Sequence, residues 1–420
     1  MKYKRIEKDN YDLYYYKTNK FKTINITTLI INKMDEKNIT LDNLLSSYLL
    51  VTNKKYNNEI SMNKKYMDLY DPNFSIYDIY RDLHYKFFDM TFLDEKYLEK
   101  DNNKKVIDFY YDSIFSLNET NNKLDKTQTK LIKGQMKTNY LLDEEDPMEK
   151  AYYNSFKLIS DDLPIKINPK GNIKDLKRIN TKDSYKYYKD QIKNGRVVVF
   201  LTGNIDDKLI SFIDDKLKNK IHKNNYDIKT IYDVTNVNKV TKEVEETSFN
   251  ESILYLIYKI PNITKREREI VLPLFNNILG GSSSKLFNNV REKNSLAYYA
   301  YSNFIKHFGI IYMYAGINFK NYKKALELMK DTLDDMKKGN ISLNEIKDSK
   351  EAITSSLIKN EDNIYSIVND MITSILFDKV DKDTLRKEIV TVTKKELIDL
   401  SKKLELDVEY LLKGVNHENN

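Results

Sequence analysis

A glycine pair between two apolar segments is the feature of this sequence that most constrains its fold. Before the pair, apolar residues recur at helical spacing over residues 270–278. Gly280 and Gly281 follow directly, and because glycine tolerates the left-handed geometry of a helix C-terminus, they predict the end of that helix. The helical pattern then resumes, and residues 296–304 have the character of a strand. This stretch therefore predicts a helix, a turn, a second helix and a strand.

Three serines follow the glycine pair. The hydroxyls of Ser282, Ser283 and Ser284 are suited to capping the second helix. A phosphate-binding loop of the G-x-x-x-x-G-K-[ST] type is excluded, because Lys285 follows a serine and precedes a leucine. On spacing alone, the stretch is equally well explained as an ordinary helix–turn–helix corner of a hydrophobic core.

The composition indicates a folded protein of more than one domain. The chain has 420 residues, of which 40% are hydrophobic and 32% charged. It has no cysteine, which excludes disulfides and cysteine-based metal or nucleophile sites. Neither the apolar core of a signal peptide nor an apolar run long enough for a membrane span is apparent. We therefore expect a cytoplasmic protein without a membrane span.

The net charge of +7 comes from 70 basic and 63 acidic residues that are mixed along the chain. A nucleic-acid-binding surface should instead concentrate basic residues on one element, with aromatic residues among them. We therefore expect no nucleic-acid partner.

A similar order of elements occurs twice, which predicts an internal duplication. Each half opens with β-branched strands and closes with a strand that ends in glycine, at Gly203 and Gly414. The sequence predicts an α+β fold with two related domains, each an antiparallel-rich sheet covered by helices, over residues 1–220 and 246–420. Residues 221–245 are the predicted linker.

Two details of the first half are also predicted. A helix is expected from Thr40, which is placed to cap it, to Leu50. Residues 161–180 contain two prolines and a glycine and are expected to form a loop.

The glycine-pair stretch resembles a signature of the insulinase/pitrilysin-like zinc metallopeptidases, which include the mitochondrial processing peptidases. That signature reads L-G-G-x-x-S-x-L-F, then R-E-K-x-x-L-x-Y. The matching residues are Leu279, Gly280, Gly281, Ser284, Leu286, Phe287, Arg291, Glu292, Lys293, Leu296 and Tyr298. The resemblance implies two related α/β-roll domains. It also implies that Arg291 and Tyr298 form a pair that reaches the substrate.

The zinc site of the active family members is missing from this sequence. Those members carry H-x-x-E-H on a helix, with two histidine ligands and a glutamate that takes a proton from the attacking water. The resemblance places Asn43 and Ser47 at the histidine positions and Ser46 at the glutamate position. The further ligand would fall within residues 131–136, where no carboxylate stands. The four histidines, His84, His222, His307 and His417, are far apart in sequence, so we expect no metal.

These observations leave three hypotheses. In the first, the chain is the non-catalytic subunit of a heterodimeric zinc peptidase. It would add Arg291 and Tyr298 to the active site of an H-x-x-E-H partner that holds the only zinc and cleaves a peptide substrate. The segment 15–23 resembles a bacterial group of such non-catalytic members. In the second, it is a catalytically inert structural or peptide-binding protein, and a homodimer is also allowed. In the third, it is an enzyme of unrecognised mechanism.

The functional role of Arg291 and Tyr298 also has a structural alternative. Arg291 could simply pair with a carbonyl or a carboxylate at the end of its helix. Tyr298 could be a core residue of its strand.

Overall fold

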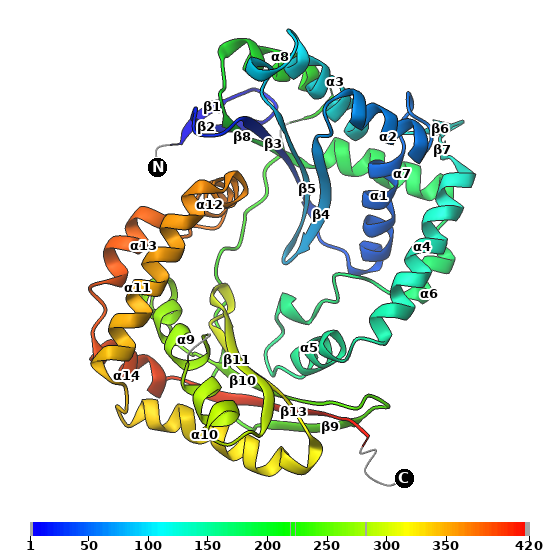
Figure 1. Ribbon diagram of the computed structural model, residues 1–420. Helices are drawn as coiled ribbons and strands as arrows, with labels where there is room; N and C mark the ends of the chain where they lie inside the picture. Colours follow the sequence, from blue (N-terminus) through cyan, green and yellow to red (C-terminus); the bar gives the residue numbers. More distant parts are fainter. Residues whose placement is uncertain (1–2, 219, 223, 282–283, 416–420) are drawn as a thin grey trace. The chain divides into compact units, whose positions relative to one another are not determined.

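The computed structural model describes residues 3–218, 220–222, 224–281 and 284–415. It contains two units, each built on one mixed sheet with helices (Figure 1), which confirms the predicted α+β fold. The first unit comprises Met1–Leu142, Ile167–Ile228 and Asn363–Leu376. The second comprises Asp143–Lys166, Lys229–Asp362 and Phe377–Asn420.

The sheet of the first unit has the strand order β1-β2-β8-β3-β5-β4. Its strands are β1 (Lys4–Glu7), β2 (Asp12–Lys17), β3 (Thr23–Lys33), β4 (Asn73–Tyr80), β5 (Leu83–Leu93) and β8 (Arg196–Gly203). The β2–β8 pair is parallel, and the other pairs are antiparallel. Alternate residues of β3 serve different purposes: Ile24, Ile26 and Ile30 join the main hydrophobic core, whereas Asn25 and Thr27 hydrogen-bond on the opposite face.

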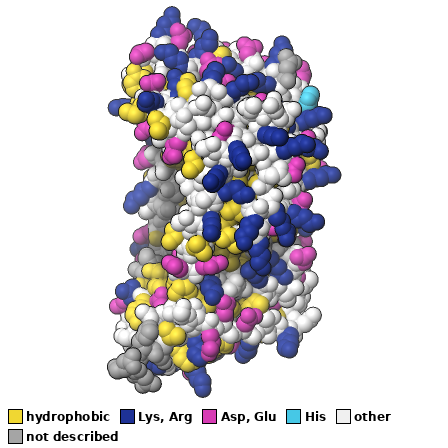
Figure 2. Space-filling view, turned by 90° about the vertical axis from the view of Figure 1, so that its right-hand side faces the viewer, with side chains coloured by type: hydrophobic (Ala, Val, Ile, Leu, Met, Phe, Trp, Pro, Cys, Tyr) yellow, Lys and Arg dark blue, Asp and Glu magenta, His cyan; other side chains and the backbone are white. Residues whose placement is uncertain are grey.

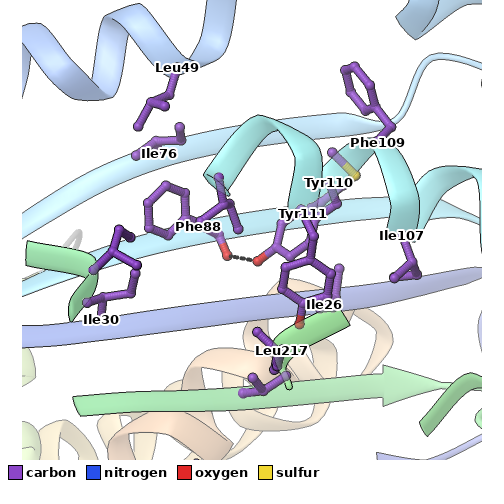
Figure 3. Close-up of a cluster of buried hydrophobic side chains, with 14 of the residues drawn as sticks. Ile26, Ile30, Leu49, Ile76, Phe88, Ile107, Phe109, Tyr110, Tyr111 and Leu217 are labelled. Atoms are coloured by element: carbon purple, nitrogen blue, oxygen red, sulfur yellow. Dashed lines mark hydrogen bonds between the residues drawn. The ribbon is translucent and has the colours of Figure 1, made fainter. Parts of the chain in front are cut away.

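Helices cover the core face of this sheet. They are α1 (Ile39–Val51), α2 (Glu59–Asp68), α3 (Asn102–Phe115), α6 (Ile173–Arg178), α7 (Thr181–Asn194) and α8 (Asp207–Leu217), with α4 (Lys126–Glu144) and the short hairpin β6 (Glu119–Thr120)–β7 (Lys123–Leu124). Figure 3 shows this core, in which the hydroxyl of Tyr110 donates to the Phe88 carbonyl at 2.8 Å. The same hydroxyl accepts from the Thr28 N–H at 2.9 Å, so α3 is tied to both central strands.

The second unit repeats the topology of the first. Its strands are β9 (Thr241–Glu246), β10 (Ser252–Lys259), β11 (Ala297–Ile305), β12 (Ile310–Ile317) and β13 (Glu405–Lys413). The order β9-β13-β10-β12-β11 corresponds strand by strand to β2-β8-β3-β5-β4. The β9–β13 pair is parallel and the remaining pairs are antiparallel, as in the first unit. This correspondence confirms the predicted internal duplication.

Helices and two π-helical turns complete the second unit. They are α5 (Pro147–Lys157), η4 (Glu267–Val271), α9 (Leu272–Gly280), η5 (Phe287–Glu292), α10 (Tyr322–Lys337), α11 (Leu343–Lys359), α13 (Lys382–Ile389) and α14 (Lys394–Lys402). All eight residues of β10 are buried, because helices pack against both faces of the sheet. Leu254 and Leu256 face the larger helix layer, and Ile253 and Ile257 lie in the cluster that includes α5.

Each unit also takes one helix from the other half of the sequence. Helix α5 precedes the last strand of the first sheet but packs on β10 and β13 of the second unit. Helix α12 (Ile364–Leu376) follows α11 but packs on β8 and β3 of the first unit. The observed units therefore differ from the continuous ranges 1–220 and 246–420, because the apolar faces of these two helices are buried on the sheet of the other half.

Some local predictions were wrong. Thr40 does not cap α1, which begins at Ile39; its hydroxyl instead accepts from the Asn172 N–H at 3.0 Å. The expected loop 161–180 contains α6, and the expected linker 221–245 contains most of β9. Strand β9 was missed because its sequence, Thr-Lys-Glu-Val-Glu-Glu, is that of a polar, exposed edge strand.

No helix within the described residues is long and apolar enough to cross a membrane. Lys and Arg side chains share the face shown in Figure 2 with Asp and Glu side chains.

The glycine pair lies at the end of α9, but it does not have the left-handed geometry that was predicted for it. Neither glycine has a positive φ; Gly281, which follows α9, is extended with φ −72° and ψ −175°. Gly280 is required by close packing instead, because a Cβ there would lie 2.1 Å from the backbone nitrogen of Ser302 in β11.

We predict that Gly280→Ala lowers the free energy of unfolding by about 3 kcal/mol, because the added methyl meets backbone that cannot move aside. Urea denaturation followed by circular dichroism measures the change. Gly134→Ala in α4 is the matched control. A Cβ there meets nothing within 4 Å, so the helix should gain about 1 kcal/mol. Equal effects of the two substitutions would contradict the packing argument.

Candidate functional site

The three positions that the resemblance assigns to the zinc motif lie on α1, and each of the three side chains hydrogen-bonds within the chain. Asn43 Nδ2 donates to the carbonyls of Pro169 and Lys170, at 2.8 and 3.0 Å. The Ser47 hydroxyl donates to the Asn43 carbonyl at 3.0 Å. The Ser46 hydroxyl donates to Asp78 Oδ2 at 2.7 Å, in a charged cluster described next. These side chains serve the packing of α1.

A buried ionic cluster lies beside these positions, formed by Asp42, Asp78, His84, Lys86 and Tyr187. Lys86 Nζ is 2.8 Å from Asp78 Oδ1 and 2.6 Å from the Ser46 hydroxyl. His84 Nε2 lies 2.6 Å from the same Asp78 oxygen, and His84 Nδ1 lies 3.7 Å from Asp42 Oδ2. The Tyr187 hydroxyl is 3.0 and 3.2 Å from the two carboxylate oxygens of Asp42. The Asp42, Asp78, His84 and Lys86 side chains are no more than 4% exposed.

The two carboxylates of the cluster have opposite pKa shifts. Burial raises the pKa of Asp42 to about 6, and the attraction of His84 and Lys86 offsets only part of that effect. Burial acts on Asp78 in the same direction, but attraction to Lys86 and the hydrogen bond with His84 outweigh it. The pKa of Asp78 is therefore held well below its usual value. Asp78 is thus the anion that Lys86 neutralises.

The arrangement is unsuited to a metal ion. The ammonium of Lys86 bonds to the Ser46 hydroxyl and to Asp78, so a positive charge already occupies this position. The segment 131–136 belongs to α4 and contains neither aspartate nor glutamate, so it provides no carboxylate ligand. Across the ranges that the structure describes, no three His, Cys, Asp or Glu side chains are placed to hold a metal.

The histidines are dispersed. The His84 ring stacks on Tyr80 with ring centroids 5.0 Å apart. His307 lies in the turn η6 (Lys306–Phe308), which joins β11 to β12. In the sequence, His222 lies between α8 and β9. His417 lies outside the described residues.

Sequence reasoning missed the buried ionic cluster. The signal was available in β4 and β5, where Asp78, His84 and Lys86 interrupt apolar stretches. Polar residues at alternate strand positions usually indicate a solvent-facing side, so this signal was indistinguishable from an exposed edge.

The glycine-rich segment connects α9 to η5. Gly280 is buried against Ser302, and the Ser284 hydroxyl accepts from the Phe287 N–H at 3.3 Å, as the capping prediction requires. Ser282 and Ser283 lie outside the described residues. The Ser284 cap thus fixes the start of the helical segment that carries Arg291.

Arg291 and Tyr298 are both exposed in the second unit, and the structure shows no contact between their side chains. Arg291 is in the last turn of η5; its guanidinium lies 5.0 Å from the Phe287 ring centroid and 3.8 Å from the Glu292 carboxylate. Tyr298 is 65% exposed. The β11–β12 register shifts between Ala297 and Tyr299, so Tyr298 is the extra residue of a β-bulge, a feature that redirects a side chain. Tyr298 is therefore not a core residue of its strand.

Comparison with known proteins connects these features to one family. Residues 178–353 match the family described as "Peptidase M16 inactive domain". The "Probable inactive metalloprotease YmfF" of Bacillus subtilis is 25% identical over 415 residues, 95% of this chain and 94% of that protein. The "Uncharacterized zinc protease YmxG" of Bacillus subtilis is 30% identical over 179 residues, 41% of this chain and 42% of that protein.

A solved structure shows the same fold over the whole chain. The crystal structure of a conserved protein from Enterococcus faecalis V583 superposes with a TM-score of 0.91 and covers 100% of both chains at 23% identity.

We predict that Lys86→Met costs about 3 kcal/mol of stability, because it leaves Asp78 as an uncompensated buried anion. The double variant Lys86→Met/Asp78→Asn should recover much of that loss, and urea denaturation of the variants measures it. Lys265→Met removes the exposed Lys265–Asp378 pair and should cost under about 0.5 kcal/mol. Additive effects of the two core substitutions would contradict the proposed pairing.

The raised pKa of Asp42 predicts a particular pH dependence. Between the pKa of an unfolded aspartate and about 6, the folded state holds a proton that the unfolded state has lost. Stability is therefore lost as pH rises through about 6. The variant Asp42→Asn keeps an acceptor for Tyr187 but cannot titrate, so it should not show this loss. The free energy of unfolding of the variant, relative to that of the parent, should therefore rise by about 1 kcal/mol from pH 5 to pH 7.5. Urea denaturation of both proteins at the two pH values measures the difference. A constant difference would contradict the assignment.

Proposed function

Because this chain belongs to the M16 family of insulinase/pitrilysin-like peptidases, as a member without the zinc site, we propose that it is the non-catalytic subunit of a heterodimeric zinc metallopeptidase. Its partner would be a homologous chain with an intact H-x-x-E-H motif, and that partner alone would hold zinc. The YmxG relative is a zinc protease by name, which supports the existence of zinc proteases among the homologues of this chain. The substrate would be a peptide or a small protein.

The contrast between the zinc-motif positions and the pair Arg291 and Tyr298 supports this proposal. The side chains of Asn43, Ser46 and Ser47 form hydrogen bonds within the first unit. Lys86 supplies the cation of the buried ionic cluster. Arg291 and Tyr298, by comparison, are exposed and make no hydrogen bond with each other. A side chain that only stabilised the fold would be expected to bury more of its surface or to pair more closely.

The chemistry of peptide hydrolysis gives these two residues distinct roles. The partner's zinc would activate the attacking water. As the water oxygen adds to the scissile carbonyl, negative charge collects on the carbonyl oxygen, and the Tyr298 hydroxyl would donate a hydrogen bond to it. The guanidinium of Arg291 would hold a neighbouring backbone carbonyl of the substrate, fixing its register. Neither role requires a metal ligand from this chain.

The β-bulge at Tyr298 fits such a role. A bulge gives one residue an orientation that regular strand pairing would not, while the flanking residues keep β11 in the sheet. The hydroxyl would thus be presented on a rigid element rather than on a loop.

The alternative is that the chain is a catalytically inert structural or peptide-binding protein of the same family. The partly exposed tyrosines on one face of the second sheet favour binding as such a protein's role. In that case Arg291 and Tyr298 would be dispensable.

We predict that this chain and an H-x-x-E-H homologue from the same genome cleave a fluorogenic peptide only when mixed. Tyr298→Phe should lower kcat by about 100-fold, the typical cost of one preorganised oxyanion donor, with the association of the chains unchanged. Activity assays, with analytical ultracentrifugation for association, test both points.

The matched control is Tyr97→Phe, since Tyr97 is 48% exposed and lies outside β11. It should leave the rate unchanged. Full activity of the partner alone, or no association of the two chains, would overturn the heterodimer proposal in favour of the inert protein.

A further inference from the structure

Four tyrosines form a continuous row across the sheet of the second unit. Tyr301 on β11 stands opposite Tyr314 on β12, Tyr314 opposite Tyr255 on β10, and Tyr255 opposite Tyr410 on β13. Directly opposed residues on neighbouring strands point to the same face of a sheet, so the four rings line one face. Tyr299 lies on this face as well, two residues before Tyr301.

One end of the row is well covered and the other only in part: α5 also reaches that other end, where the Tyr299 hydroxyl lies 2.9 Å from Met148 Sδ. Over the covered end, Tyr152 of α5 packs on Tyr255 with ring centroids 6.5 Å apart, and the Tyr410 hydroxyl donates to Glu245 at 2.6 Å. At the partly covered end, Tyr299, Tyr301 and Tyr314 are only partly buried. Their ring centroids form a triangle with sides of 6.5, 6.2 and 6.1 Å.

A half-buried carboxylate adjoins this triangle. The Tyr299 hydroxyl lies 3.5 Å from Glu251 Oε2. Gly316 makes the approach possible, because a Cβ there would lie 2.2 Å from Glu251 Oε1 and 2.4 Å from the Tyr299 ring. The absence of a side chain at Gly316 therefore seats the carboxylate against the aromatic rings.

Glu251, which directly precedes β10, differs from Glu245 of β9 and Glu409 of β13 in having no cation beside it among the described residues. Glu245 lies 2.9 Å from Lys150 Nζ, and Glu409 lies 2.6 Å from Lys330 Nζ. Within the described part of the chain, Glu251 has no ion-pair partner. Burial raises its pKa, and the hydrogen bond from Tyr299 offsets only part of that shift. A carboxylate without a counterion, beside partly exposed aromatic rings, is an electrostatic setting that a bound cation would complete.

We propose that Glu251, Tyr299, Tyr301 and Tyr314 form a binding site for the cationic side chain of an arginine or lysine in a peptide. A cation above the triangle would face the negatively polarised faces of the three rings, and the Glu251 carboxylate would balance its charge. A divalent metal is disfavoured, because one carboxylate is far short of the oxygen ligands it requires and no acidic cluster was found among the described residues. The cation site is inferred from the geometry alone. The further inference that a peptide carries the cation rests on the proposed function.

The test measures binding to this chain alone, so it is independent of any partner and of cleavage. Isothermal titration would compare a Gly-Ser-rich peptide that contains arginine with the same peptide carrying citrulline, a neutral isostere of arginine. The arginine peptide should bind about tenfold more tightly. Glu251→Gln should abolish that preference by weakening the arginine peptide alone, whereas Glu243→Gln, at an exposed position on β9, should leave both affinities unchanged.

Variants of Tyr301 separate the ring from the hydroxyl. Tyr301→Leu should weaken the arginine peptide about threefold, the scale of one exposed cation–π contact, and Tyr301→Phe should restore the affinity. Circular dichroism of each variant confirms that it is folded. The proposal is overturned if neither peptide binds, if both bind equally, or if Glu251→Gln leaves the preference intact. A mixture that fails to cleave while the arginine preference persists would overturn the heterodimer and leave this site standing.

Discussion

Both faces of each sheet must be covered, and this constraint organises the whole chain. In the second unit every residue of β10 is buried, and in the first unit β3 is buried over most of its length. A sheet with two apolar faces needs two layers of cover. The helices that follow the opening strands supply one layer in each unit. Part of the second layer comes from α5 in one unit and α12 in the other, and these helices arise from the opposite halves of the sequence.

In the first unit, the three positions that the resemblance assigns to a zinc motif have structural roles. Two histidines and a glutamate on α1 would need to face a metal, and the chain has Asn43, Ser46 and Ser47 there instead. Their bonds to the 169–170 backbone and to Asp78 hold α1 in place. The buried ammonium of Lys86 balances the Asp78 carboxylate, so the cluster is satisfied without an ion from solution. Histidines and a glutamate placed at these positions would lie beside that ammonium, which would repel a bound dication.

The sequence was most informative where periodicity was strong and least where tertiary contacts decided the outcome. The helix over residues 270–278 and the strand over residues 296–304 followed from apolar spacing and turn residues. The duplication followed from the matching closing strands, and the topology confirmed it. An amphipathic pattern, however, does not identify the sheet on which a helix packs. The exchange of α5 and α12 therefore could not be predicted from the sequence. For the site, Arg291 and Tyr298 could be named from the signature. The seating of Glu251 depends on a missing side chain across the strand at Gly316, which no local pattern indicates.

The exchange of α5 and α12 also orders events during synthesis on the ribosome. The first half emerges with its strands and α1–α8 complete, but the helix that covers part of its second sheet face ends only at Leu376. Until then, β8 and β3 lack part of their cover. Helix α5, in turn, emerges long before the sheet that it covers, whose last strand ends at Lys413. Neither half can therefore complete its native state before most of the chain has been translated, and the two units must mature together. The exchange of the two helices thus couples the completion of one unit to the synthesis of the other half of the chain.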